Sequence, residues 1–299
     1  MYSFARRMSR SRRALLITFD AFDTLFHPRR PVPETYASIA HSYGLPKSKV
    51  TDERLRAAFK TAFKAQSKAY PNYGREDVLR GRYGGPRQWW SDLIKMTFTE
   101  VLEDNNNLPG GMVEKLLDAF ASDEGYALYD DVRPFFEEFK KFKTSGPFEH
   151  VVTGAISNSD DRVPAVLKSL GLSIGNVRAD RDRSSIELPG FEQVMPDGRA
   201  EDNEIDMVIT SYEAGEEKPN RLIYEVAASR ARQCVLATDD VEWTRIHVGD
   251  DAQKDYAGAI DAGWHAFLIL RDDKLDLPKD TKKIDSLQEL MTEIGSIKQ

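Results

Sequence analysis

Short apolar runs rich in β-branched residues alternate along this chain with segments whose apolar residues recur every three or four positions. The first run covers residues 15–19, and later runs cover 150–156, 207–210, 245–248 and 265–270. Runs of this length predict buried strands, and the segments between them have the period of amphipathic helices. Strands that alternate with helices predict an α/β protein with a doubly wound, parallel, Rossmann-like sheet.

A block of helical pattern interrupts this alternation directly after the first strand. From residue 34 to about 120 the apolar positions keep helical spacing, and Gly44 is placed to end the first of these helices. We therefore expect a discontinuous core made of residues 14–27 and 131–299. An all-helical cap is expected as an insertion at 28–130.

Two segments depart from both patterns. Five arginines stand in the first 13 residues, with no acidic residue before Asp20. This composition predicts a basic tail at 1–13, with targeting to the nucleus or mitochondrion as the alternative. Residues 173–206 are polar without a sustained period, which predicts a long surface insertion able to serve a protein partner.

Composition excludes several classes of protein. Of the 299 residues, 30% are charged and the formal net charge is −7, which argues against a nucleic-acid-binding protein. The single cysteine, Cys234, excludes an intrachain disulfide and a thiolate zinc cluster, and it fits a reducing compartment. No apolar run approaches the roughly 18 residues that cross a bilayer. We expect a soluble, intracellular protein without a membrane partner, cytoplasmic or nuclear, with a mitochondrial location as the alternative.

Polar residues follow four successive predicted strands, where candidate chemistry is concentrated. They are Asp20 with Asp23, Ser157 with Asn158, Lys218, and Asp250 with Asp251 and Asp255. The carboxyl ends of parallel strands meet at one edge of a sheet, where such folds bind their ligands. Clustered carboxylates favour a hard cation such as Mg²⁺, and a lysine beside a hydroxyl favours anionic oxygens. Taken singly, each of these motifs is equally typical of a turn, a helix cap or a solvated lysine; their order along the chain favours a site.

This ordered set resembles the motifs of the haloacid dehalogenase superfamily. The first motif reads Asp20-Ala21-Phe22-Asp23-Thr24-Leu25, and the later ones match Ser157-Asn158, Lys218-Pro219 and Gly249-Asp250-Asp251 through Asp255. Cap segments such as Tyr70–Gly74 and Arg87–Trp90 resemble one group of relatives within that superfamily. The resemblance covers nearly the whole chain except the basic start and residues 173–206, and it implies an α/β core with an inserted helical cap.

The resemblance also implies roles for individual residues. Asp20 would be the nucleophile and a Mg²⁺ ligand, together with the carbonyl oxygen of Phe22 and the carboxylate of Asp250, with Asp255 in support. Ser157 and Asn158 would hold the transferred group, and Lys218 would neutralise it and Asp20. The remaining expected contacts with a small anionic, phosphorylated substrate come from the first loop and from the cap: Phe22, Asp23, Thr24, Arg87, Trp89 and Trp90. Ordinary packing inside the cap is the alternative role for the two tryptophans.

One position departs from the phosphatase pattern. Phosphatases of this superfamily place a second Asp two residues after the nucleophile as general acid and base, whereas this chain has Phe22. Loss of such a group costs about 10²–10⁴ in rate unless Asp23 replaces it, so a slow phosphatase is expected. The alternatives are a haloacid dehalogenase, which expels halide without a proton, and a binding protein that has lost efficient turnover. The acidic fourth motif favours the Mg²⁺-dependent enzyme over the dehalogenase.

Overall fold

The structure is a computed structural model that describes residues 12–103, 108–179, 203–235, 241–271 and 280–296. Its centre is a seven-stranded sheet in which every neighbouring pair is parallel. The strand order is β5 (Ile174–Arg178), β6 (Ile205–Thr210), β4 (His150–Ser157), β1 (Arg12–Phe19), β7 (Val241–Gly249), β8 (His265–Ile269) and β9 (Lys283–Ile284). The predicted doubly wound α/β class is confirmed.

Strand β1 lies in the middle of the sheet, and its apolar residues are buried on both faces. Leu15, Ile17 and Phe19 belong to the cluster that includes buried residues of α6 (Val132–Ser145), α7 (Val163–Ser169) and α12 (Leu287–Ser296). Leu16 belongs to the cluster formed with α10 (Arg221–Cys234) and α11 (Gly258–Asp261). Strand order reverses at β1, so a crevice is expected outside the carboxyl ends of β4, β1 and β7.

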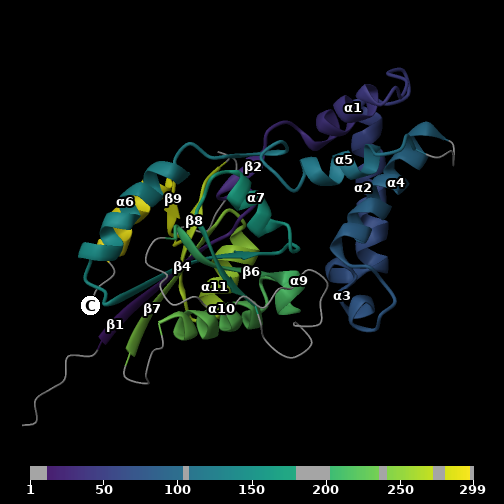
Figure 1. Ribbon diagram of the computed structural model, residues 1–299. Helices are drawn as coiled ribbons and strands as arrows, with labels where there is room; N and C mark the ends of the chain where they lie inside the picture. Colours follow the sequence, from purple (N-terminus) through teal and green to yellow (C-terminus); the bar gives the residue numbers. More distant parts are fainter. Residues whose placement is uncertain (1–11, 104–107, 180–202, 236–240, 272–279, 297–299) are drawn as a thin grey trace, which may run out of the picture.

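The inserted segment forms a helical cap beside this edge, shown in blue in Figure 1. Its helices are α1 (Val32–Ser42), α2 (Asp52–Ala69), α3 (Pro71–Leu79), α4 (Pro86–Leu102) and α5 (Met112–Ala119). A short antiparallel ribbon, β2 (Phe26–Pro28) paired with β3 (Tyr126–Leu128), joins the cap to the core. The expectation of a purely helical insertion at 28–130 missed this ribbon, because three residues are too few to show a strand period. Within the described ranges, no helix combines the length and apolarity that crossing a membrane requires.

Hydrogen bonds connect the cap directly to the core. The indole nitrogen of Trp90 donates to Asp160 Oδ2 at 2.6 Å. Asn72 Nδ2 donates to the carbonyl oxygen of Ser211, the first residue of α9 (Ser211–Ala214), at 2.8 Å. Asn72 and Tyr73 both have positive φ angles, of 45° and 58°, a conformation that non-glycine residues seldom adopt. The cap therefore lies against the same sheet edge where the motifs gather.

Several expected boundaries are corrected by the structure. Arg12 and Arg13, assigned to the basic tail, begin β1, and the rest of that tail lies outside the described residues. The expected insertion at 173–206 begins with the edge strand β5 and ends inside β6, while residues 180–202 lie outside the described part. The apolar pattern of a strand is not evident in β5, because it contains Gly175, Asn176 and Arg178. Edge strands tolerate such polar residues.

Two helices near this edge begin at capping side chains. Pro219 precedes α10, which begins at Arg221, because the Asn220 side chain accepts from the Leu222 N–H and caps the helix there. The segment after Asp251 begins as a π-helical turn, η1 (Ala252–Ala257), before α11. Asp251 caps that turn by accepting from the N–H groups of Gln253 and Lys254. The cap places Asp255 one turn later, facing back into the sheet edge.

Candidate active site

Asp20 is the first residue after β1, and its backbone and carboxylate are both held in place. Its N–H donates to the carbonyl oxygen of Val248 on the neighbouring strand β7 at 2.8 Å. Its carboxylate is 14% exposed, and Oδ1 lies 2.8 Å from the ammonium of Lys218. After Asp20 the chain turns sharply, with Asp23 at a φ of 54°. The turn keeps Asp20 at the carboxyl end of β1, facing the crevice.

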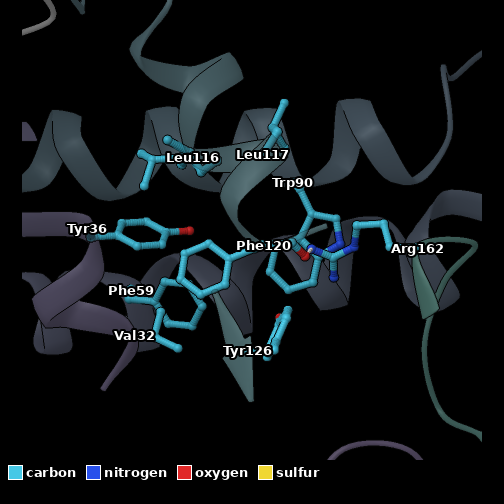
Figure 2. A pocket seen from close by; sticks show the side chains of 10 residues that line it. Val32, Tyr36, Phe59, Trp90, Leu116, Leu117, Phe120, Tyr126 and Arg162 are labelled. Carbon is cyan, nitrogen blue, oxygen red and sulfur yellow. Dashed lines mark hydrogen bonds between the residues drawn. The ribbon is translucent and has the colours of Figure 1, made fainter. Parts of the chain in front are cut away.

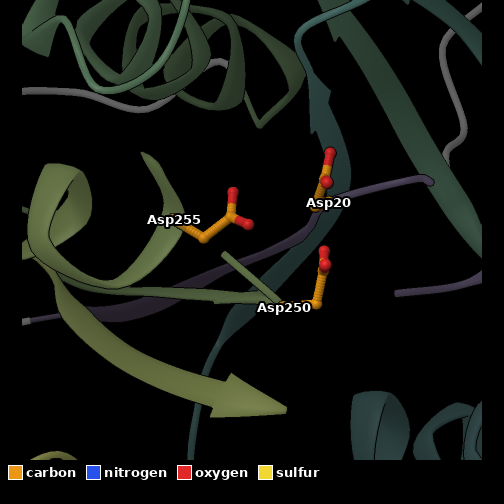
Figure 3. A group of neighbouring side chains, drawn as sticks. All are labelled: Asp20, Asp250 and Asp255. Atoms are coloured by element: carbon orange, nitrogen blue, oxygen red, sulfur yellow. The ribbon is translucent and has the colours of Figure 1, made fainter. Parts of the chain in front are cut away.

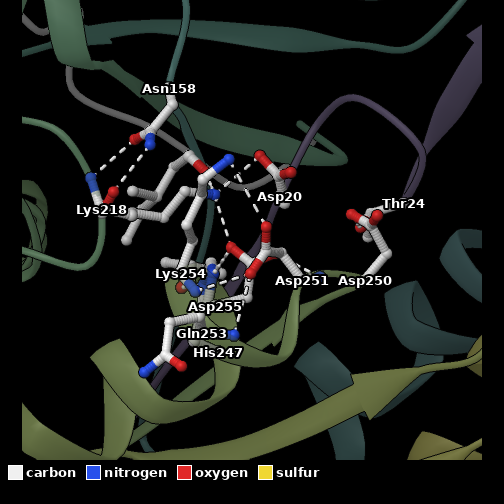
Figure 4. Close-up of polar contacts among 12 residues, drawn as sticks. Asp20, Thr24, Asn158, Lys218, His247, Asp250, Asp251, Gln253, Lys254 and Asp255 are labelled. Carbon is white, nitrogen blue, oxygen red and sulfur yellow. Dashed lines mark hydrogen bonds and ion pairs between the residues drawn. The ribbon is translucent and has the colours of Figure 1, made fainter. Parts of the chain in front are cut away.

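Lys218 is the buried cation of the site, only 2% exposed (Figure 4). Besides Asp20, its ammonium contacts Asp255 Oδ1 at 2.6 Å and the carbonyl oxygen of Ile156 at 2.7 Å. The Asn158 side chain fixes the Lys218 backbone: its Oδ1 accepts from the Lys218 N–H at 2.6 Å, and its Nδ2 donates to the Lys218 carbonyl at 2.8 Å. Burial opposes the charge on Lys218, but Asp20 and Asp255 outweigh burial and raise its pKa.

Asp255 is the anion that anchors Lys218. Its Oδ2 accepts from the Asp251 N–H at 3.0 Å, and its Oδ1 lies 3.1 Å from His247 Nε2. Burial works against the ionised form, yet the Lys218 charge and the hydrogen bond from His247 hold its pKa below the usual range. Burial lowers the pKa of His247 and so favours the neutral imidazole. Nε2 then donates to the ionised Asp255, which can only accept, and Nδ1 lies 2.8 Å from the Thr18 hydroxyl.

Asp250 completes a group of three carboxylates. One oxygen each from Asp20, Asp250 and Asp255 lies within 4.8 Å of the others (Figure 3). Burial raises the pKa of Asp20 to about 7, in spite of Lys218, and raises that of Asp250 to about 6, with Asp255 adding to both shifts. Asp250 Oδ1 accepts from the Thr24 hydroxyl at 3.2 Å. Lys218 alone therefore does not offset the burial of Asp20 and Asp250 and the repulsion from Asp255.

These groups open into a cavity of about 390 Å³, called here the catalytic cavity. Its floor is formed by Asp20, Lys218, Asp250 and Asp255, and its opposite wall includes Trp90 of the cap. Ser157 lies at the end of β4 on the same floor, 2% exposed, and within the described residues its hydroxyl makes no hydrogen bond. The Ser157 hydroxyl is therefore available to a ligand.

Phe22 also lines the catalytic cavity, but its ring packs into an aromatic group at the cap junction. Its centroid lies 4.6 Å from that of Phe26 and 5.6 Å from that of Tyr126. The hydrogen bonds of the turn go to the carbonyls of Ala21 and Phe26, and within the described residues none uses the Phe22 carbonyl. The Phe22 carbonyl oxygen is therefore available to coordinate a cation.

Some residues expected to contact a substrate lie elsewhere. Thr24 is fully buried and outside the cavity lining, where it orients Asp250. Arg87 is 64% exposed and pairs with Asp118 on α5. Trp89 is buried inside the cap, with its indole nitrogen donating to the Tyr70 carbonyl, which is the packing alternative. Trp90, the next residue along, does line the cavity.

Sequence reasoning missed other residues of the cavity wall. Tyr73, Tyr126 and Arg162 line it, and Phe63 does so while remaining 40% exposed. Arg162 stood four positions after Asn158 in the second motif, and Tyr73 stood inside a cap segment that had been singled out. Both positions were visible, but the direction of their side chains depends on how the cap is seated.

Comparison with known proteins identifies what this chain resembles. The family model for haloacid dehalogenase-like hydrolases matches residues 15–263. Haloacid dehalogenase-like hydrolase domain-containing protein 3 of Bos taurus is 29% identical over 87% of this chain and 84% of its own length.

Two solved structures share the fold. A 2-haloacid dehalogenase from Pseudomonas syringae pv. Tomato DC3000 has a TM-score of 0.53 at 17% identity, covering 94% of this chain and 97% of that one. The HAD-hydrolase YfnB from Bacillus subtilis, solved bound to magnesium, has a TM-score of 0.51 at 15% identity, covering 95% of this chain and 99% of that one. At these identities the likeness concerns the fold alone.

Proposed function

Because the chain belongs to the haloacid dehalogenase-like hydrolase family, we propose that it is a Mg²⁺-dependent hydrolase of small phosphorylated substrates, with Asp20 as the nucleophile. The observation that carries this proposal is the charge at the sheet edge. Ionised Asp20, Asp250 and Asp255 carry three negative charges, and within the described residues the cation in contact with them is Lys218, beside a neutral His247. Lys254 and Arg162 also line the cavity, but each pairs with another carboxylate, Asp251 and Asp160. A divalent cation would balance the remaining two charges.

The donor set fits Mg²⁺ in chemistry as well as in charge. Asp20, Asp250 and the Phe22 carbonyl offer hard oxygen donors, and Mg²⁺ is commonly bound through one or two carboxylates with substrate phosphate and water. Asp255 stands behind them, since its oxygens already accept from Lys218, His247 and the Asp251 N–H. When bound, the cation would neutralise phosphoryl oxygens and the two half-buried carboxylates.

The chain's own residues then have distinct tasks. The carboxylate of Asp20 attacks phosphorus, a new bond forms between them, and the bond from phosphorus to the leaving-group oxygen breaks. Lys218 holds Asp20 in position and offsets charge on the phosphoryl oxygens, and Ser157 can donate to one of them. Asn158 acts through Lys218, because its side chain is used to hold the Lys218 backbone. Water then releases phosphate from Asp20.

This proposal is tested by phosphate release from acetyl phosphate and an aryl phosphate. We expect release that requires Mg²⁺ and stops with a chelator. Asp250→Asn should lose most of it at limiting Mg²⁺, because one of two carboxylate donors becomes neutral. Asp251→Asn removes a neighbouring charge, but its side-chain oxygen can still cap the π-helical turn, so it should retain most of the activity. Release that continues unchanged in chelator would refute the metal requirement.

Mg²⁺ is also expected to raise the melting temperature of the resting protein. A ligand that binds only the folded state contributes about 2.7 kcal/mol at a concentration one hundred times its Kd. Here the gain arises because the cation relieves the repulsion among Asp20, Asp250 and Asp255. Differential scanning fluorimetry with and without Mg²⁺ measures it, and Asp250→Asn should reduce the shift while Asp251→Asn preserves it. Equal shifts in both variants would place the ion elsewhere.

A second candidate function is 2-haloacid dehalogenation, which the aromatic Phe22 favours because halide leaves without a proton. Halide release from a 2-haloacid that is indifferent to chelator would support it over the phosphatase. If neither phosphate nor halide is released while Mg²⁺ still raises the melting temperature, a third candidate is favoured, a binding protein of this fold. A protein partner at residues 173–206, a small anionic ligand and an intracellular location remain proposals alongside these.

A further inference from the structure

A second cavity, called here the cap pocket, adjoins the catalytic cavity, and Figure 2 shows the side chains that line it. It measures about 70 Å³, and three residues, Trp90, Tyr126 and Arg162, line both cavities. Apart from these, its walls come from the cap helices and are mainly aliphatic and aromatic, including Val32 of α1 and Leu117 of α5. The two cavities therefore adjoin at these three residues, with the polar groups around Asp20 on one side and apolar cap side chains on the other.

Tyr36 gives the cap pocket one polar group. Its side chain comes from α1, is 3% exposed, and packs against the rings of Phe98 and Phe120. Figure 2 shows its hydroxyl directed toward the other lining side chains. Within the described residues this hydroxyl has no hydrogen-bond partner. Burial raises the pKa of Tyr36, so the phenol stays neutral and can donate one hydrogen bond to a ligand.

Arg162 does not make the cap pocket an anion site, although it carries a charge. Its Nε donates to Asp160 Oδ1 at 2.8 Å, its Nη1 donates to the Phe120 carbonyl at 3.2 Å, and its guanidinium lies 4.2 Å from the centre of a Trp90 ring. Asp160, 1% exposed in its side chain, neutralises Arg162 and also accepts from Trp90. The lining that the two cavities share at Arg162 and Trp90 is thus held in position and balanced in charge.

We propose that the natural substrate carries a short, branched apolar leaving group that occupies the cap pocket, with one hydrogen-bond acceptor facing Tyr36. The inference rests on the proposed phosphatase function and names its substrate class. A cavity of 70 Å³ corresponds to about five water-sized groups, enough for a branched four- or five-atom end. Polyhydroxylated leaving groups, as in sugar phosphates, are disfavoured because most of their hydroxyls would be buried unpaired.

Binding of phosphonates tests the cap pocket without requiring turnover. In Mg²⁺ and by isothermal titration calorimetry, 3-methylbutylphosphonate should bind about tenfold or more tightly than methylphosphonate. The 2,3-dihydroxypropyl analogue should bind no more tightly than methylphosphonate. Val32→Phe or Leu117→Phe should fill the pocket and remove the preference while methylphosphonate binding is kept. Met96→Phe adds the same ring on α4 outside both cavities, so it should keep the preference.

The Tyr36 hydroxyl is tested with a matched pair of probes. In 3-oxobutylphosphonate a carbonyl oxygen replaces one methyl group of the 3-methylbutyl probe. Tyr36→Phe should weaken binding of the oxo probe by about tenfold, the effect of one hydrogen bond, and leave the alkyl probe unchanged. Equal effects on both probes would contradict the assigned acceptor. Equal affinities of the wild-type protein for the methyl, dihydroxypropyl and 3-methylbutyl probes would overturn the whole inference.

Turnover separates this inference from the proposed function. Acetyl phosphate and 3-methylbutanoyl phosphate release carboxylates of nearly equal basicity, so the ratio of their kcat/KM values reports the pocket. The inference is supported if kcat/KM is higher for 3-methylbutanoyl phosphate than for acetyl phosphate and Val32→Phe abolishes this preference. Mg²⁺-dependent hydrolysis of both without preference would overturn it and leave the phosphatase intact. Phosphonate preference without any hydrolysis would support the pocket and refute the phosphatase.

Discussion

Replacing Asp20 with Asn should lower phosphate release by roughly 10⁴-fold or more, as expected when the nucleophile is removed. The amide keeps the shape of the side chain but cannot form the acyl-phosphate bond. Its fold should survive, because Lys218 retains Asp255 at 2.6 Å and the Ile156 carbonyl. Steady-state phosphate release with acetyl phosphate measures the loss.

Stability supplies the control for this variant. Burial raises the pKa of Asp20 to about 7, so above that pH the metal-free protein carries an unfavourable buried charge. Asn removes the charge, and the melting temperature of Asp20→Asn in chelator should therefore equal or exceed that of the wild type. Asp251→Asn serves as the matched neutral substitution. Activity close to that of the wild type in Asp20→Asn would eliminate Asp20 as the nucleophile.

Replacing Phe22 with Asp should raise hydrolysis of alkyl phosphates by about 10²–10⁴-fold, the usual contribution of a positioned general acid. Alkoxide leaving groups need a proton, and the Phe22 ring supplies none. Acetyl and 4-nitrophenyl phosphates leave as stable anions, so the same variant should change their rates little. The plot of log kcat/KM against leaving-group pKa should therefore be steep in the wild type and flatter in Phe22→Asp.

Two further variants separate proton donation from a change of shape. Phe22→Leu removes the contacts with Phe26 and Tyr126 without adding an acid, so it should not accelerate alkyl esters. Asp23 lines the catalytic cavity next to Phe22. If Asp23→Asn removes alkyl-ester hydrolysis from the wild-type protein, Asp23 already donates the proton and the role given to Phe22 is wrong.

The main features of the fold could be predicted from sequence because each depended on a local pattern. The apolar run of β1 is buried on both faces, as a central parallel strand must be, and it delivers Asp20 to the sheet edge. Ser157, Lys218 and Asp250 follow other strands of the same sheet, so topology alone brings them together. No finer geometry was needed to place these groups at one site.

The directions of other side chains could not be predicted, because distant segments decide them. Thr24 turns to Asp250, and Asn158 turns to the Lys218 backbone, contacts with residues more than 50 positions away. Arg162 became a wall residue only because the cap supplies Trp90 and the Phe120 carbonyl. His247 looked like an ordinary strand residue, yet it supports Asp255 from inside the core.

The hydrogen bond between Thr24 and Asp250 joins residues 226 positions apart in the chain. A ribosome therefore completes the loop after β1 long before it makes the acidic residues that face it. Contacts so remote in sequence form late, since a long loop must close before they are gained. Until β7 has left the exit tunnel and joined β1, the emerging chain holds Asp20 without Asp250, and the group of three carboxylates stays incomplete.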